Sequence, residues 1–222
     1  MWKSIVYKEW IKTRSAIAII VVVFCGMGVY SFLKINESVR MSGMVALWET
    51  VVQKDPLLLG YFKYLPLLAG ILLAITQYIP ELQFKRLKLT LHLPLKEDHI
   101  LLTMLLYGIA VIALLLLVSL PFLLWGLSLS FPREIVYAAF QQLVPWFLAG
   151  PAAYLLAVWV CLEPQWKQRI MNVIPGLLFL SLFFFSAKSG AYSPFDPFLT
   201  AAFIVSFFFP FYSAIRFKEG VQ

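Results

Sequence analysis

Six long apolar runs constrain this chain more than any other feature of its sequence. They cover residues 16–33, 57–79, 100–127, 135–162, 170–187 and 195–217. About 20 apolar residues cross the hydrocarbon core of a bilayer as a helix, and a helix pairs all of its own backbone polar groups there. Only 13% of the residues are charged, whereas roughly a quarter are charged in soluble domains. The sequence therefore predicts an all-α, polytopic membrane protein, with residues 1–222 forming one transmembrane domain of six spans.

The first fifteen residues are charged and precede the first span, so they predict an interfacial helix rather than a cleaved signal. One side of this helix would carry the apolar residues Trp2, Ile5, Val6 and Trp10. Glu9 falls inside that stripe, and an unpaired carboxylate is costly in an apolar site. We expect Glu9 to pair with a cytoplasmic basic residue, with Lys85 or Arg86 as candidates. A second short surface helix is expected at Met44–Lys54.

The distribution of basic residues predicts the orientation of the chain. With six spans, both termini lie on one side together with the connections 81–99 and 163–169, and that side holds 12 of the 18 Lys and Arg residues. Cytoplasmic loops carry the excess of Lys and Arg in membrane proteins. Both termini are therefore expected in the cytoplasm. The net charge of +7 is explained by loops beside an anionic leaflet, and we expect no nucleic-acid partner.

Residue patterns that would indicate catalysis are scarce. The sequence holds two histidines and two cysteines, and it has no phosphate-binding loop, no H-E-x-x-H and no G-x-S-x-G. We therefore expect no enzyme activity, no metal and no cofactor in this chain. A secondary transporter or channel that works alone usually has an acidic residue at mid-depth in a span, and none is expected here. That class and an intramembrane enzyme remain the alternatives.

The connection after the second span is the most informative segment. Lys85, Arg86 and Lys88 form a basic group, and in a helix Phe84, Leu87 and Leu91 share one stripe. An apolar stripe beside basic residues at a membrane exit can lie on the bilayer. It can also dock into a groove of a cytoplasmic protein.

Three features in this order resemble a known family. They are the run Tyr7-Lys8-Glu9-Trp10 before the first span, six spans with both ends inside, and Thr90 followed by Leu93-Pro94-Leu95-Lys96 before the third span. Over nearly its whole length the chain resembles the membrane permeases of type-2 ABC transporters, most of which are exporters.

The resemblance implies the partners and the interaction residues. A separate ABC ATPase subunit would bind ATP and Mg, and the permease would pair with a second copy or a paralogous permease in a bacterial cytoplasmic membrane. The elbow helix would contain Trp2, Tyr7, Lys8, Glu9 and Trp10. The coupling helix, which contacts the ATPase, would involve Glu81, Phe84, Lys85, Arg86, Leu87, Lys88, Thr90, Leu91, His92 and Leu93.

Five further polar residues are candidates to line a translocation pathway: Lys63, Thr76, Gln77, Gln141 and Gln142. Each also has an ordinary structural interpretation. Lys63 is close enough to the outer interface to extend its ammonium group toward water. The amides and the threonine can form hydrogen bonds between helices instead of contacting cargo.

Overall fold

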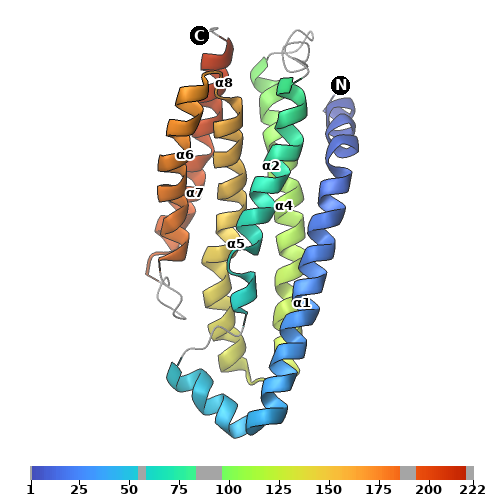
Figure 1. The fold of residues 1–222 in the computed structure, drawn as a ribbon, viewed down its shortest axis with the longest axis vertical. Helices are drawn as coiled ribbons and strands as arrows, with labels where there is room; N and C mark the ends of the chain where they lie inside the picture. Colours follow the sequence, from blue (N-terminus) through green and yellow to red (C-terminus); the bar gives the residue numbers. More distant parts are fainter. Residues whose placement is uncertain (1, 55–58, 84–96, 186–193, 219–222) are drawn as a thin grey trace.

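The computed structural model describes residues 2–54, 59–83, 97–185 and 194–218, and within these ranges the chain is helical with no strand. The expected all-α class is therefore confirmed. The elements run in the order α1 (Trp2–Lys54), η1 (Gly60–Phe62), α2 (Leu65–Gln83), α4 (Glu97–Ser128), α5 (Arg133–Leu162), α6 (Trp166–Ser181), η2 (Leu182–Phe184), α7 (Asp196–Ser206) and α8 (Phe208–Lys218) (Figure 1).

Four of the described helical segments are long and apolar enough to cross a membrane: Lys3–Met41, Gly60–Leu82, His99–Ser128 and Arg133–Leu162. The last two expected runs are also helical, but α6 has 16 residues and α7 and α8 have 11 each. Helix length therefore identifies a membrane-embedded protein with four candidate spans. The count of six remains a prediction.

Residues before and after the first expected span do not form separate helices. The interfacial helix expected at residues 1–15 and the short surface helix expected at Met44–Lys54 are continuous with the first span, since residues 2–54 form the single 53-residue helix α1. The physical reason is that no proline occurs before Pro56, so no residue interrupts the backbone hydrogen bonds of the helix. The final part of α1 turns aside across one end of the bundle (Figure 1).

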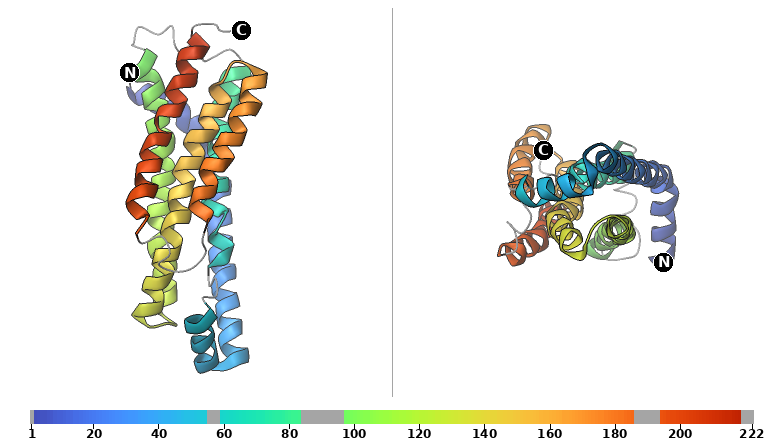
Figure 2. Two further views of the ribbon diagram at one scale, coloured as in Figure 1. Left: turned by 90° about the vertical axis from the view of Figure 1, so that its left-hand side faces the viewer. Right: turned by 90° about the horizontal axis from the view of Figure 1, so that it is seen from below.

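Helix α5 forms the centre of the bundle. It packs against α2, α4, α6, α7 and α8, and 78% of its most apolar stretch is buried, compared with 28% for α1. Figure 2 shows the other helices arranged around it. Pro145 and Pro151 lie inside α5 without ending it, because neighbouring helices can pair the backbone groups that a proline frees. The core of the protein is therefore built on one helix.

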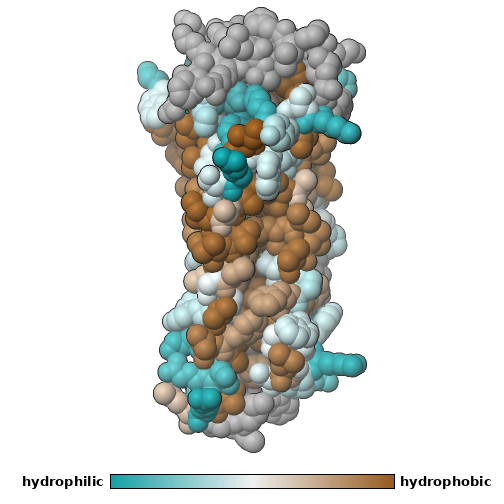
Figure 3. All heavy atoms as spheres, turned by 90° about the vertical axis from the view of Figure 1, so that its right-hand side faces the viewer, coloured by the Kyte–Doolittle hydropathy of each residue, from teal (hydrophilic) through white to brown (hydrophobic). Residues whose placement is uncertain are grey.

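The two ends of the bundle differ in what they contain. The start of α1, the end of α2, the start of α4, the α5–α6 turn and the end of α8 lie at one end, which we call the terminus end (Figures 1 and 2). The α4–α5 turn and the end of α1 lie at the opposite end. A broad apolar band separates two more polar zones on the face shown in Figure 3. Exposed residues such as Val22, Leu117 and Phe198 contribute to the apolar surface of the bundle, as expected for a surface that contacts lipid.

Helices α2 and α5 lie very close together where two glycines meet. A Cβ atom added to Gly70 of α2 would lie 2.2 Å from the carbonyl oxygen of Gly150 in α5 and 3.0 Å from the backbone nitrogen of Tyr154. Small residues at such positions let two membrane helices bring their backbones together. Only a residue without a side chain fits at position 70 in this arrangement.

We therefore expect Gly70→Ala to lower the free energy of unfolding by about 1–3 kcal/mol, the usual cost of overpacking. Gly26→Ala is the matched control, because an added Cβ at Gly26 of α1 meets nothing within 4 Å. Thermal unfolding of the detergent-solubilised protein would measure both. Equal melting temperatures for the two variants would contradict the close crossing.

Candidate functional site

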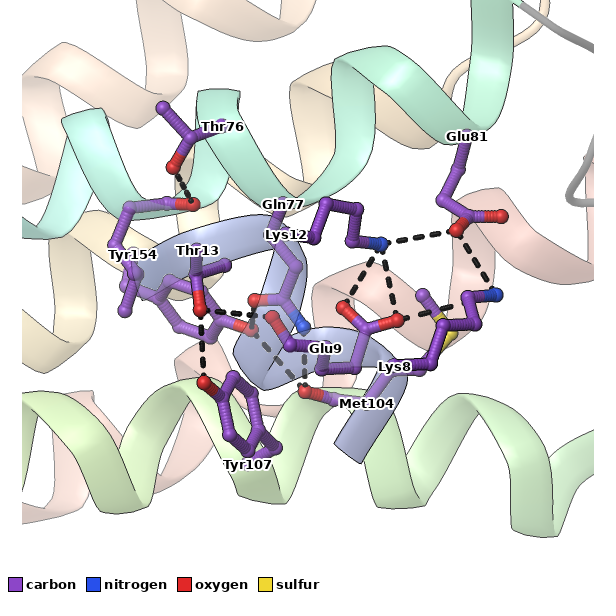
Figure 4. Close-up of polar contacts among 11 residues, drawn as sticks. Lys8, Glu9, Lys12, Thr13, Thr76, Gln77, Glu81, Met104, Tyr107 and Tyr154 are labelled. Carbon is purple, nitrogen blue, oxygen red and sulfur yellow. Dashed lines mark hydrogen bonds and ion pairs between the residues drawn. The ribbon is translucent and has the colours of Figure 1, made fainter. Parts of the chain in front are cut away.

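Four charged residues gather near the terminus end of the bundle. Lys8, Glu9 and Lys12 lie on the first turns of α1, and Glu81 lies on the last turn of α2. We call these four residues the ion-pair cluster (Figure 4). Residues three and four apart share a face of a helix, so α1 presents both ammonium groups to Glu81. The cluster contains two positive and two negative side chains and is neutral as a unit.

The contacts in the ion-pair cluster are short and shared. The Nζ atom of Lys12 lies 2.9 Å from both carboxylate oxygens of Glu9 and 2.9 Å from Oε1 of Glu81. The Nζ atom of Lys8 lies 2.9 Å from the same Oε1 atom of Glu81 and 4.0 Å from Glu9. Glu81 therefore connects the two lysines of the cluster to α2.

Burial makes this pairing obligatory. The side chains of Glu9 and Glu81 are 0% and 2% exposed, and that of Lys12 is 14% exposed. Removing a charge from water costs several kcal/mol, and breaking a buried pair leaves that cost uncompensated. Each buried carboxylate therefore needs a lysine beside it, and α1 cannot leave α2 without exposing or unpairing these charges.

The position of Glu9 within an apolar stripe predicts that its carboxylate needs a basic partner. Its described partners are Lys12, three residues along the same helix, and Lys8. The candidates Lys85 and Arg86 lie outside the described residues, so that pairing stays untested. The buried stripe of α1 runs through Ile5 and Glu9, whereas Trp10 is 49% exposed.

A second set of hydrogen bonds joins α1 to α4 beside the cluster. The hydroxyl of Thr13 donates to the carbonyl oxygen of Glu9 at 2.9 Å, and its Oγ1 atom lies 2.8 Å from the hydroxyl of Tyr107 on α4. Thr13 is fully buried. The helix that carries the lysines is therefore tied to α4 as well as to α2.

Gln77, one turn before Glu81 on α2, joins three helices. Its Nε2 atom donates to the carbonyl oxygen of Met104 on α4 at 3.0 Å, and its Oε1 atom accepts a hydrogen bond from the hydroxyl of Tyr154 on α5 at 2.8 Å (Figure 4). Gly108 makes room for this contact, because an added Cβ there would lie 2.1 Å from the Tyr154 ring. Polar side chains thus link α1, α2, α4 and α5 within one region.

A separate group of polar contacts joins α5, α6 and α8 at the terminus end. The guanidinium group of Arg169 donates to the carbonyl oxygens of Cys161 and Glu163 at 3.0 and 2.8 Å. The buried carboxylate of Glu163 accepts a hydrogen bond from the hydroxyl of Ser213 on α8 at 2.8 Å. These contacts pair backbone carbonyls at the end of α5 and attach the final helix there.

The expected site residues have different positions in the structure. Glu81, Lys8 and Glu9 come together in the cluster, Tyr7 is 65% exposed, and Trp2 begins α1. The remaining coupling-helix candidates lie outside the described residues: Phe84, Lys85, Arg86, Leu87, Lys88, Thr90, Leu91, His92 and Leu93.

The candidate pathway residues do not form one group. Lys63 follows η1, and its ammonium group lies 5.2 Å from the ring centre of Tyr64. The hydroxyl of Thr76 donates to carbonyl oxygens of its own helix. Gln142 is buried and Gln141 is partly buried in the first half of α5. Gln77 has the interhelical role described above, and a pathway through these residues stays a prediction.

The polar contacts of this region connect helices of the bundle to one another. Within the described part of the chain, no group of three or more His, Cys, Asp and Glu side chains could hold a metal ion. Lys12, Thr13, Tyr107 and Tyr154 were not anticipated. The spacing of Glu9 and Lys12 could have indicated the contact between these two side chains, since residues three apart share a helix face.

No protein-family model, curated protein or solved structure matches the chain.

We expect Glu9→Gln to lower the free energy of unfolding by up to about 3 kcal/mol. This is the low end of the cost of breaking a buried ion pair, because Lys12 still pairs with Glu81 in the variant. Glu37→Gln is the matched control. Glu37 pairs with Lys34 on the same helix at 2.7 Å, but both side chains are 47% exposed, so its loss should have little effect. Thermal unfolding in detergent would compare them, and equal losses would show that burial does not strengthen the cluster.

Proposed function

We propose that this chain is the membrane permease subunit of an ATP-driven ABC transporter of the exporter type. It would form the translocation pathway as a dimer and be moved by a separate ATPase subunit. The proposal rests on one observation: the ion-pair cluster fixes the last turn of α2 to the first turns of α1. That turn directly precedes the connection 84–96, where the sequence resembles a coupling helix.

The arrangement of the ends supports an even number of crossings. The start of α1, the end of α2, the start of α4 and the end of α8 share the terminus end (Figure 1). The charge count assigns 12 of the 18 basic residues to this side, which favours the cytoplasm. In our proposal α6 with η2 forms the fifth crossing, and α7 with α8 forms the sixth.

The cluster suggests how movement would reach the spans. ATP binding would draw two ATPase subunits together, and the connection after α2 would move with them. Glu81 would pass this displacement to α1 through Lys8 and Lys12, and Gln77 would pass it to α4 and α5. Packed helices tied in this way move as rigid bodies. The permease has no phosphate-binding loop, so ATP and Mg belong to the partner.

The alternatives receive less support from the described residues. A stand-alone secondary transporter typically uses an ionisable residue near the middle of the bilayer. In the part of the chain that the structure describes, the buried acidic residues Glu9, Glu81 and Glu163 lie toward the terminus end. An intramembrane enzyme needs convergent reactive groups, and the buried hydroxyls and amides described above are engaged in helix contacts.

The first test is association with an ATPase. The tagged chain would be solubilised from its native membrane, and ATP hydrolysis would be measured in the purified fraction. We expect Leu87→Asp or Leu91→Asp to reduce the bound activity about tenfold, a loss of about 1.4 kcal/mol in binding. Met41→Asp is the control, because Met41 is 78% exposed toward the other end of α1. Cargo transport by the purified chain without nucleotide would overturn the proposal.

The second test separates ATPase binding from transmission. Glu81→Lys would place a third cation beside Lys8 and Lys12. We expect it to keep the ATPase bound but to alter the rate of ATP hydrolysis by the complex several-fold, because like charges at close range repel.

The double variant Lys8→Glu with Glu81→Lys restores an opposite-charge pair across α1 and α2. We expect it to recover most of the original hydrolysis rate. An unchanged rate in Glu81→Lys, with a folded complex, would contradict transmission through the cluster. Failure of the double variant to recover would do the same.

A further inference from the structure

A cavity of about 320 Å³ lies between α1 and α4, toward the end of the bundle opposite the termini. Its lining includes Phe32, Asn36, Phe122, Trp125, Gly126 and Ser130. The cavity opens on the outer surface of the bundle, where Phe122 is 48% exposed and Trp125 is 62% exposed. It belongs to neither the ion-pair cluster nor the proposed coupling segment.

The inner part of this cavity is aromatic. The rings of Phe32 and Phe122 meet edge to face, with their centres 6.0 Å apart. Phe32 also lies against Gly126, since an added Cβ on that glycine would come within 2.1 Å of the phenylalanine ring. Gly126 thus lets the Phe32 ring lie close to α4, and the wall formed by these residues offers no polar side chain.

The polar side chains of the cavity lie at one end only. Asn36 comes one turn after Phe32 on α1, and Ser130 lies just beyond the end of α4, four residues after Gly126. The apolar stretch of α4 ends at Ser128, so this end of the cavity coincides with the edge of the apolar band. Trp125 lies beside it, and tryptophan is enriched at the headgroup level of membranes. The cavity therefore has an apolar part toward the membrane centre and a polar part at the interface.

We propose that this cavity binds one phospholipid, with an acyl chain against Phe32 and Phe122 and the phosphate beside Asn36 and Ser130. Arg40 supports the headgroup position, because it is exposed four residues after Asn36 on the same face of α1. Basic side chains at a membrane surface attract anionic lipid groups. A lipid tail reaches the cavity directly from the bilayer, whereas water would find no hydrogen-bond partner along its apolar wall.

A second cavity provides a comparison within the same molecule. The groove between α2, α5 and α6 has a volume of about 240 Å³ and is lined by apolar residues such as Ile75, Leu156 and Val173, with Cys161 beside them. It has no polar end that would orient a headgroup. The α1–α4 cavity is distinguished by its polarity gradient, and its assignment does not depend on the proposed permease function.

The test uses photoreactive lipids in vesicles of phosphatidylcholine and phosphatidylglycerol that contain the full chain. A trace phosphatidylcholine carries a diazirine on its acyl chain, and adducts are mapped by mass spectrometry after irradiation. We expect labelling to concentrate on residues 122–130. Equal labelling at Leu114 and Leu117, which are 67% and 70% exposed on the same helix, would show ordinary contact with surrounding lipid and overturn the proposal.

Two matched variants test the position of the lipid. Asn36→Trp fills the polar end, and we expect labelling of residues 122–130 to fall about tenfold. Leu33→Trp places the same bulk on α1 at a residue that is 63% exposed and lies outside the cavity lining, and labelling should persist. Melting temperatures check that both variants fold. Unchanged labelling in Asn36→Trp, or equal losses in both, would overturn the assignment.

A final comparison tests the headgroup. A diacylglycerol with the same diazirine chain lacks the phosphate, so we expect it to label residues 122–130 several-fold less than the phospholipid does. Arg40→Gln should remove most of this difference. Equal labelling by both probes in the unmodified protein would contradict a phosphate at the polar end.

Discussion

The two lysines and two glutamates shared by α1 and α2 set the conditions for the rest of this bundle. Separating the two helices at that point would leave buried charges without partners, which costs far more than an ordinary polar contact. The cluster therefore fixes where the first helix lies along the second. Thr13 and Gln77 extend the same alignment to α4 and α5. A protein whose remaining surface is mostly apolar depends on a few polar contacts to align its helices.

The sequence predicted helices more accurately than their ends. The helical segments Gly60–Leu82, His99–Ser128 and Arg133–Leu162 overlap the expected spans 57–79, 100–127 and 135–162, because length and apolar content decide such helices locally. The change in polarity after residue 33 predicts the end of a helix there, whereas α1 continues to Lys54. The polarity of a helix changes where it leaves the lipid, but the helix continues until its backbone hydrogen bonds are interrupted. No proline interrupts those of α1 before Lys54.

The candidate site was predictable only in part. Glu9 stood out because a charged residue interrupts an apolar stripe, and that anomaly correctly indicated a buried pair. The identity of the partner helix depended on tertiary packing. Tyr154 lies 77 residues from Gln77, and their contact requires the space beside Gly108. No local pattern in a sequence indicates such a meeting, because it arises from how three helices cross.

The contact between Gly70 and Gly150 has a consequence for any motion of α2. Glu81 is 11 residues beyond this crossing and Leu65 is 5 residues before it, or about 16 Å and about 8 Å along the axis at 1.5 Å per residue. The crossing lies closer to the Leu65 end of α2 than to the Glu81 end, so α2 has a short part and a long part on either side of it. A tilt of α2 against α5 about it would have to break the hydrogen bond between Gln77 and Tyr154, and it would swing the Leu65 end the opposite way, through about half the distance. A large displacement of the Glu81 end would therefore produce a smaller displacement of the Leu65 end, in the opposite direction.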